Sequence, residues 1–183
     1  IGLAEEREER KRTIVERCEL AASLVNGTGK AAVVWGHLDD ECNLLEKLIP
    51  DAIQVSGKDK DEAKEEKFSA FQSGAARVMV IKPKIGAWGL NWQHCAHVVS
   101  FASHSFEQDY QSIRRCWRFG QTQPVLAEYV TSDGEQRVLR NLQRKAELAD
   151  RMFESLTRHM RDALHIDRAV DYPHTEEVPS WLS

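Results

Sequence analysis

Two arginines that lie three residues apart are the side chains in this sequence best suited to phosphate chemistry. Arg115 and Arg118 fall in a segment that we expect to be helical over residues 106–118, so they share one face, and Gln111 lies one turn before Arg115. A guanidinium group is planar, permanently charged and fork-shaped, which suits phosphate oxygens. In phosphoryl transfer, an arginine offered from a second lobe raises the rate by about 10³- to 10⁵-fold. A solvated, salt-bridged helix face is the alternative for the same residues.

A turn with two glycines precedes that helix. Residues 86–91 read Gly-Ala-Trp-Gly-Leu-Asn and follow a predicted strand over residues 77–81. Glycine permits positive φ and a close approach of backbone to a ligand, and parallel sheets bind ligands at the carboxyl ends of their strands. Two glycines also occur in loops that bind no ligand. The turn is therefore a candidate binding site only because it lies shortly before the arginines in the sequence.

The segment over residues 111–121 resembles motif VI of superfamily-two helicases, and most closely that of the Snf-type (Swi/Snf-like) ATPases, which reads Gln-x-x-x-Arg-x-x-Arg-x-Gly-Gln. The matching positions are Gln111, Arg115, Arg118, Gly120 and Gln121. The resemblance implies that Arg115 and Arg118 are catalytic arginine fingers that reach the phosphates of ATP, with Gln111 aligning them. It also places Gln121 among the nucleotide-binding residues.

The glycine turn is similar to motif V of the same family, Gly-Gly-x-Gly-Leu-Asn, with Ala87 in place of one glycine. This resemblance implies that Gly89 and Asn91 line the nucleotide side of a cleft and bind ATP, while neighbouring backbone touches nucleic acid. Residues 33–37 resemble motif IV, and residues 57–71 resemble the segment that follows it. The resemblance as a whole covers residues 31–129.

Nucleic-acid contacts are expected beside the glycine turn. Lys82 and Lys84 stand close to the place where the family often has Ser or Thr, and we expect them to bind DNA phosphates; surface lysine is the alternative. Trp88, Trp92 and Trp117 are crowded near both motifs, and a ring that stacks on a base contributes about 1–3 kcal/mol. Core packing is the alternative for at least two of the three. Trp88, held between glycines, is the expected nucleic-acid contact.

The rest of the sequence predicts the elements that position these motifs. Short apolar runs expected to be strands cover residues 31–35, 52–55, 77–81, 97–101 and 125–130. Between them we expect a helix capped by Asp39 or Asp40 and stopped at Pro50, a charged helix over residues 60–72, and the arginine helix. Alternating strands and helices imply right-handed crossovers and a mostly parallel sheet. The expected fold class is α/β: a RecA-like three-layer lobe with flanking N-terminal and long C-terminal helices.

Four segments are expected along the chain: an amphipathic lead-in helix and linker over residues 1–29, the lobe over 30–131, a long helix over 132–168, and a flexible tail over 169–183. The long helix opens at a capping box formed by Ser132 and Glu135. Its single apolar stripe is expected to pack on the lobe or on the lead-in helix. The start at Ile1, within a charged helix, suggests an excised fragment.

Composition bounds the partners and the compartment. Lys and Arg number 25 against 29 Asp and Glu, so the net charge of −4 provides no global basic field for nucleic acid, and any such contact must be local. The four cysteines are widely spaced and follow no secretory segment, which favours reduced thiols. No apolar run approaches the roughly 18 residues that a membrane span needs. We expect a protein of the cytoplasm of a bacterial or phage-infected cell, or of a eukaryotic nucleus.

The tryptophan cluster over residues 88–92 and the pair Cys116-Trp117 resemble helicases of phages and prophages.

The sequence lacks a phosphate-binding loop. Residues 29–31, Gly-Lys-Ala, miss the first glycine and the hydroxyl of a Walker A motif, and the acids at residues 39–41 are better explained as helix caps than as a Walker B motif. The His and Cys residues over 94–104 lack zinc-ligand spacing, so no metal site is expected. We therefore expect ATP with Mg²⁺ to be held mainly by a missing N-terminal lobe, and the isolated chain to be inactive.

The leading hypothesis is the C-terminal lobe of an ATP-dependent DNA translocase or helicase. Such a lobe closes on the N-terminal ATP-binding lobe of the same protein over ATP and double-stranded DNA. One alternative is a non-catalytic module with a RecA-like fold that binds nucleic acid or protein. Another is a self-sufficient ATPase, which predicts ATP turnover by this chain alone.

Overall fold

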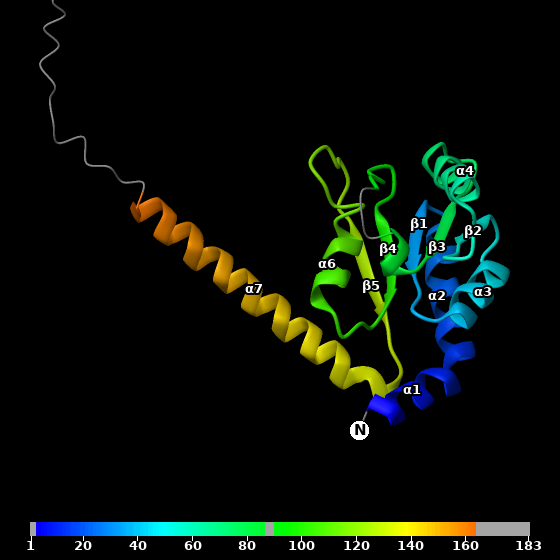
Figure 1. Cartoon of the computed structure of the whole chain (residues 1–183), viewed down its shortest axis with the longest axis horizontal. Helices are drawn as coiled ribbons and strands as arrows, with labels where there is room; N and C mark the ends of the chain where they lie inside the picture. Colours follow the sequence, from blue (N-terminus) through cyan, green and yellow to red (C-terminus); the bar gives the residue numbers. More distant parts are fainter. Residues whose placement is uncertain (1–2, 87–89, 164–183) are drawn as a thin grey trace, which may run out of the picture. The chain divides into compact units, whose positions relative to one another are not determined.

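A five-stranded parallel sheet forms the centre of the protein (Figure 1). The computed structural model describes residues 3–86 and 90–163. The strand order is β2-β3-β1-β4-β5, and every neighbouring pair is parallel. The strands are β1 (Ala32–Trp35), β2 (Ala52–Val55), β3 (Val78–Ile81), β4 (His97–Phe101) and β5 (Leu126–Val130). The predicted α/β fold class with a RecA-like sheet is confirmed.

The sheet lies between two apolar cores, which makes the lobe three-layered. Alternate side chains of β1 enter opposite cores: Ala32 and Val34 face one, and Val33 and Trp35 face the other. The first core is covered by α2 (Ile14–Thr28) and α3 (Asp39–Leu48), and the second by α4 (Asp61–Gln72) and the segment after residue 90. Burial on both faces explains why β1, β3 and β4 are apolar runs rather than alternating sequences.

The lead-in segment forms two helices, α1 (Leu3–Arg12) and α2, where the sequence predicted one. Thr13 separates them. Its hydroxyl donates to the carbonyl of Glu9 at 2.8 Å, and its amide donates to the same carbonyl at 3.0 Å. A hydroxyl that competes for a helical carbonyl tends to bend the helix. Gly29 ends α2 in the left-handed conformation, with φ of 61°.

The predicted cap of α3 is wrong, because neither Asp39 nor Asp40 precedes the helix. Leu38 is the N-cap residue, and the carboxylate of Glu41 accepts the backbone amides of His37 and Leu38, both at 2.9 Å. Glu41, at the third position of the helix, thus bonds back to the backbone at the N-cap, as the acid of a capping box does.

The arginine helix is shorter than predicted. It is α6 (Phe106–Ile113), and residues 114–118 continue as a turn. Ser105 caps its start by accepting the amide of Gln108 at 3.3 Å, as predicted. The helix ends early because the carbonyl of Arg115 accepts the amide of Trp92 at 2.9 Å, and the amide of Cys116 bonds back to Ile113 at 3.0 Å with the tighter spacing of a 3₁₀ turn.

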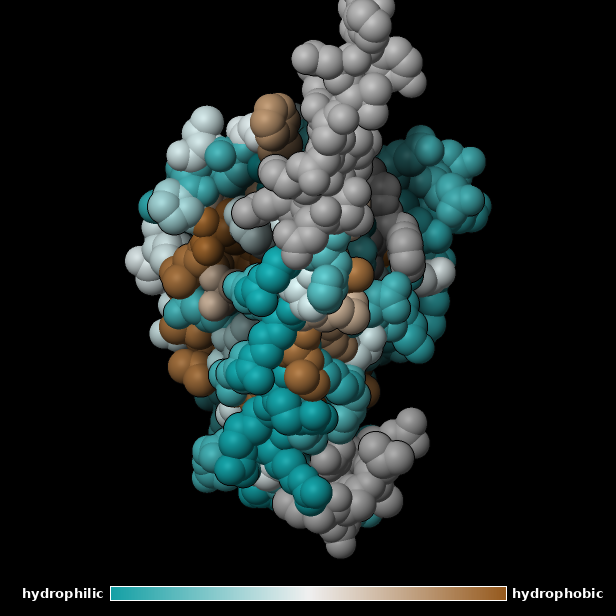
Figure 2. Space-filling model, turned by 90° about the vertical axis from the view of Figure 1, so that its left-hand side faces the viewer, coloured by the Kyte–Doolittle hydropathy of each residue, from teal (hydrophilic) through white to brown (hydrophobic). Residues whose placement is uncertain are grey.

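The C-terminal helix begins at the predicted capping box. Ser132 and Glu135 cap a short 3₁₀ helix, η1 (Asp133–Glu135), which leads into α7 (Gln136–Ala163). The chain forms two compact units, residues Ile1–Ala146 and residues Glu147–Ser183, and the boundary between them falls within α7. In the first unit Val138 and Leu142 are buried. In the described part of the second unit the apolar stripe is exposed at Leu148, Met152, Phe153, Leu156 and Met160. Hydrophobic side chains, in brown, reach the surface among hydrophilic ones on the face drawn in Figure 2.

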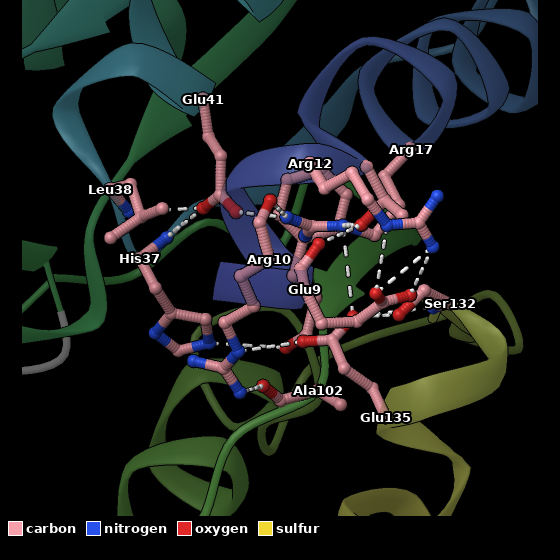
Figure 3. Close-up of polar contacts among 12 residues, drawn as sticks. Glu9, Arg10, Arg12, Arg17, His37, Leu38, Glu41, Ala102, Ser132 and Glu135 are labelled. Atoms are coloured by element: carbon pink, nitrogen blue, oxygen red, sulfur yellow. Dashed lines mark hydrogen bonds and ion pairs between the residues drawn. The ribbon is translucent and has the colours of Figure 1, made fainter. Parts of the chain in front are cut away.

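A buried carboxylate ties η1 to the first helix (Figure 3). Glu135 is fully buried and forms ion pairs with Arg10 at 2.6 Å and with Arg17 at 3.6 Å. The guanidinium of Arg10 also donates to the carbonyl of Ala102, just after β4, at 2.9 Å. One side chain of α1 therefore joins the start of the C-terminal helix to the carboxyl edge of the sheet.

A second buried carboxylate extends this cluster to α2 and α3. Arg17 pairs with Glu41 at 2.8 Å, and its guanidinium lies 4.8 Å from the ring centre of Phe101. His37 lies 3.1 Å from the carbonyl of Phe101, and burial lowers the pKa of its ring. We call Arg10, Arg17, Glu41 and Glu135 the buried charge cluster. It fixes both flanking helical segments to the lobe.

Candidate functional site

The two arginines converge on one backbone carbonyl. Arg115 donates to the carbonyl oxygen of Leu90 at 3.0 Å, and Arg118 donates to the same oxygen at 3.3 Å. Arg115 also donates to the side-chain oxygen of Gln111 at 3.4 Å. The side chains of Gln111, Arg115 and Arg118, which were predicted to share one surface, therefore lie close together. The turn after Ile113 brings Arg118 back beside Arg115, where the prediction relied on a continuous helix.

The arginines differ in exposure. Only 7% of the Arg115 surface is accessible, whereas Arg118 is exposed. Burial, and then the charge of Arg118, lower the pKa of the Arg115 guanidinium, although an arginine remains charged at any physiological pH. Two like charges that lie close together create a positive potential that an anion would neutralise. The pair is thus suited to an incoming phosphate.

Gln121 fastens the arginine turn to the segment that precedes β4. Its amide nitrogen donates to three carbonyl oxygens, those of Gln93 at 3.0 Å and of Cys95 and Cys116 at 3.1 Å each. Its side-chain oxygen accepts the amide of Gln123 at 3.0 Å. The sequence placed Gln121 among nucleotide-binding residues. Among the described contacts, its side chain bonds to backbone groups of its own turn and of the segment before β4. That position lets Gln121 set the geometry of the turn.

Gly120 completes this turn in a conformation that favours glycine. Its φ is 95°, and a Cβ at this position would lie 3.1 Å from the side-chain nitrogen of Gln93. Gln93 in turn donates to the carbonyl of Phe119. The Gly-Gln pair after the second arginine therefore has a local structural reason, because one residue permits the turn and the other bonds it in place.

The residues expected to bind nucleic acid lie in three different settings. Lys82 follows β3 and forms an ion pair with Asp39 at 2.7 Å, and the hydrogen bond from Lys82 lowers the pKa of that carboxyl. Lys84 is exposed on the short helix α5 (Pro83–Gly86), which the sequence did not predict. Trp88 lies outside the described residues. The sequence could not reveal the Lys82–Asp39 pair, since its members come from separate strand–helix junctions.

The residues expected at the nucleotide side of the glycine turn are only partly described. Gly89 lies outside the described residues, and Asn91 is exposed. Trp92 is buried in the second core, with its ring centre 6.0 Å from that of Trp35 and 5.5 Å from that of Phe71. The core-packing alternative thus holds for Trp92. Trp117 is instead exposed, and it contacts Arg114.

Metal and membrane features can be stated for the described residues. Over residues 3–86 and 90–163, no three His, Cys, Asp or Glu side chains gather as ligands of one ion would. His97, one of the histidines considered from the sequence, lies 2.7 Å from the carboxylate of Glu128. In the same part of the chain no helix combines the length and the apolar character that crossing a bilayer requires. The four cysteines are free and buried.

Comparisons with known proteins identify the family and the fold of the chain. The family model of the helicase conserved C-terminal domain matches residues 16–120, a range that contains both arginines and the glycine turn. Among solved structures, the C-terminal part of the Fun30 ATPase domain matches with a TM-score of 0.58 and 17% identity over 68% of this chain, which shows a shared fold. This chain spans 43% of that structure. No curated protein matches. Neither match bears on a phage or prophage origin.

Proposed function

Because the chain belongs to the family of helicase conserved C-terminal domains, we propose that it is the C-terminal lobe of an ATP-dependent DNA translocase of the Snf type. In this proposal Arg115 and Arg118 are arginine fingers for ATP that an N-terminal lobe of the same protein holds with Mg²⁺. The observation that carries the proposal is the convergence of both guanidinium groups on the Leu90 carbonyl, inside the range that the family model matches.

The contacts of the two arginines suggest a division of roles. Arg115 is buried and bonded to Gln111, so it is held in place, while Arg118 is exposed and bonded only weakly at 3.3 Å. A phosphate oxygen is a stronger acceptor for a guanidinium than a neutral carbonyl, because a hydrogen bond between two ions is about twice as strong. Arg118 can therefore exchange the Leu90 carbonyl for phosphate at little cost, with Arg115 as the fixed charge behind it.

The DNA side of the proposal rests on the carboxyl edge of the sheet. Lys82 and Lys84 follow β3 at this edge, and we assign both to contacts with the phosphates of a duplex. In the sequence, Trp88, Gly89 and Asn91 fall between β3 and the arginines, so we assign them to coupling between DNA and ATP. Gln121 supports this coupling by fastening the arginine turn.

The test is DNA-stimulated ATP turnover by the protein that carries both lobes. Arg118→Ala is expected to lower turnover by at least about 10³-fold, because charge on the transferring phosphate loses its stabilising partner. Arg144→Ala is the matched control, since Arg144 is an exposed arginine on α7, and its turnover is expected to stay at the wild-type level. Normal turnover in folded Arg118→Ala protein would overturn the assignment. Absence of any ATPase activity in the wild-type protein would instead favour a non-catalytic binding module.

A further inference from the structure

Four planar side chains form a ladder along one side of α6 and the turn after it. The rings of Phe106 and Tyr110 have centres 5.9 Å apart. The guanidinium carbon of Arg114 lies 5.9 Å from the ring centre of Tyr110 and 5.1 Å from that of Trp117. We call Phe106, Tyr110, Arg114 and Trp117 the aromatic ladder. Arg114 is its third rung and lies against two rings.

The ladder follows from helix spacing and from the early end of α6. Phe106, Tyr110 and Arg114 are four residues apart, so they lie above one another on a helix. Trp117 joins them because the chain turns after Ile113. Asp109 points elsewhere: it is buried and accepts the hydroxyl of Tyr129 at 2.6 Å, which anchors α6 to β5. The inner side of the helix is thus fixed, and the ladder lies on another side.

The rings of the ladder reach the surface. Tyr110 is 39% exposed and Trp117 is 54% exposed. Contact with Arg114 supports Trp117 on one face, and cation–π attraction favours that arrangement. A ring that is already held in place loses little conformational freedom when a ligand binds to its other face.

One cation lies within the ladder and another lies near its start, although the chain as a whole is acidic. Arg114 is a rung itself, and Lys145 lies near the start of α6, where its ammonium group donates to the carbonyl of His104 at 2.9 Å. The guanidinium edge of Arg114 carries N–H groups that need acceptors when water is displaced. A surface of rings and cations matches a ligand that combines flat π faces with phosphate oxygens.

The length of the ladder favours a strand over a single nucleotide. The eight residues of α6 extend about 12 Å, which equals three to four steps of about 3.4 Å along one nucleic-acid strand. A nucleoside triphosphate has one base and would use a single rung. In a duplex both faces of each base are already stacked on neighbours, so only an unpaired strand offers free faces.

We propose that the aromatic ladder binds an unpaired nucleic-acid strand, with a base stacked on the outer face of Trp117 and phosphates near Arg114 and Lys145. This inference goes beyond the proposed function, which concerns ATP and duplex DNA. It uses neither Arg115 nor Arg118. If both proposals hold, the lobe contacts an unpaired or displaced strand through residues other than its arginine fingers.

The test uses the 183-residue chain and a labelled dT oligomer of about twelve nucleotides at low salt. The oligomer is expected to quench tryptophan emission of the wild-type chain, and Trp117→Ala is expected to remove that quenching and to raise Kd by about 5- to 100-fold. Trp117→Phe keeps an aromatic face and is expected to bind within about threefold of wild type. Phe153→Ala is the matched control, because Phe153 is 60% exposed in the second unit, and it is expected to leave Kd unchanged.

Several results would overturn the proposal that the aromatic ladder binds an unpaired strand. These are no binding of the oligomer by the wild-type chain, equal Kd values for wild type and Trp117→Ala, and quenching by ATP or by a matched duplex as strong as by the oligomer. Loss of binding in both Trp117→Ala and Trp117→Phe would also contradict stacking. Because the test measures no ATP hydrolysis, its outcome is independent of the assignment of the arginine fingers.

Discussion

Lys82 illustrates how one residue can be held ready for a ligand. Its ammonium group pairs with Asp39, the first residue of α3, at 2.7 Å, and the Asp39 side chain is 57% exposed. An exposed ion pair contributes little to stability, typically about 0–1 kcal/mol, so a DNA phosphate can replace the carboxylate. Asp39 then acts as a competitor for the DNA contact.

This competition predicts opposite effects of two substitutions on duplex binding. Asp39→Asn is expected to tighten binding, since it removes a negative charge and frees Lys82. Lys82→Ala is expected to weaken binding and to reduce the slope of log K against log salt by about one. The measurement is a salt titration of duplex affinity. Lys30→Ala serves as control, because Lys30 is exposed before β1, at the opposite end of the strands. Equal salt slopes for Lys82→Ala and Lys30→Ala would contradict the DNA role.

The buried cysteines give a prediction about pH. Burial raises the pKa of both Cys18 and Cys42 from the ordinary value of 9.0 to about 12. The unfolded chain therefore loses these protons from about pH 9, while the folded chain keeps them until about pH 12, so stability falls across that window. We expect a lower Tm at pH 10.5 than at pH 8, and no reaction of native thiols with a disulfide reagent at pH 8. Rapid labelling of Cys18 in native protein would contradict this.

At the scale of single residues, sequence reasoning succeeded where spacing decides contact and failed where distant segments meet. Gln111 and Arg115 are one turn apart and do touch. The pairing of Lys82 with Asp39 and the contact of Trp117 with Arg114 depend on the exact course of junctions and turns. The periodicity of the sequence does not predict the path of the chain at these junctions and turns, so neither contact could be predicted.

Among the elements, α1 and η1 stand out because both lie outside residues 16–120, the range of the family match. They are joined by Arg10 and Glu135, which are separated by 125 positions in the sequence. The buried charge cluster also includes Arg17 and Glu41, so the two added elements share one anchor on the lobe (Figure 3). Freeing one of them is therefore expected to loosen the other.

Glu135→Gln tests this shared anchor. The change keeps the shape of the side chain but leaves Arg10 and Arg17 without their common carboxylate, and an uncompensated buried charge is expected to cost about 3 kcal/mol of unfolding free energy. Hydrogen exchange is expected to rise together in α1 and around residues 133–142. Glu9→Gln is the control, because its partner Arg12 is largely exposed, and it is expected to change stability by less than about 1 kcal/mol. Faster exchange in only one of the two elements would contradict a shared anchor.

Element types were predictable here, whereas element ends were not. Short apolar runs between predicted helices indicated all five strands. The physical reason is clearest for β1 and β3, which are buried at every residue and so leave little choice of side chain, whereas β2 and β5 are buried only in part. The end of α6 at Ile113 depends on the amide of Trp92, and the break at Thr13 depends on a hydroxyl bond to Glu9. The capping box at Ser132 was predictable from three-residue spacing, but the partners of Glu135 were not.

At the scale of the whole molecule, the proposed function makes this chain one half of an ATP site. The lobe offers arginines, a fastened turn and a lysine-bearing sheet edge, while the proposed N-terminal lobe holds ATP. Arginine fingers act mainly on the transition state, where charge on the transferred phosphate is spread out, and much less on bound ATP. Loss of an arginine finger is therefore expected to slow hydrolysis of ATP and to leave binding of ATP nearly unchanged.

The most direct measurement compares two affinities in the protein that carries both lobes, that for ATP and that for ADP with aluminium fluoride, a mimic of the transition state. In Arg118→Ala we expect affinity for the mimic to fall by about 10³-fold while affinity for ATP changes by less than about threefold. A control in Arg144→Ala is expected to leave both affinities unchanged. Equal losses for ATP and the mimic, or no loss for either, would contradict the claim that this chain supplies the arginine finger.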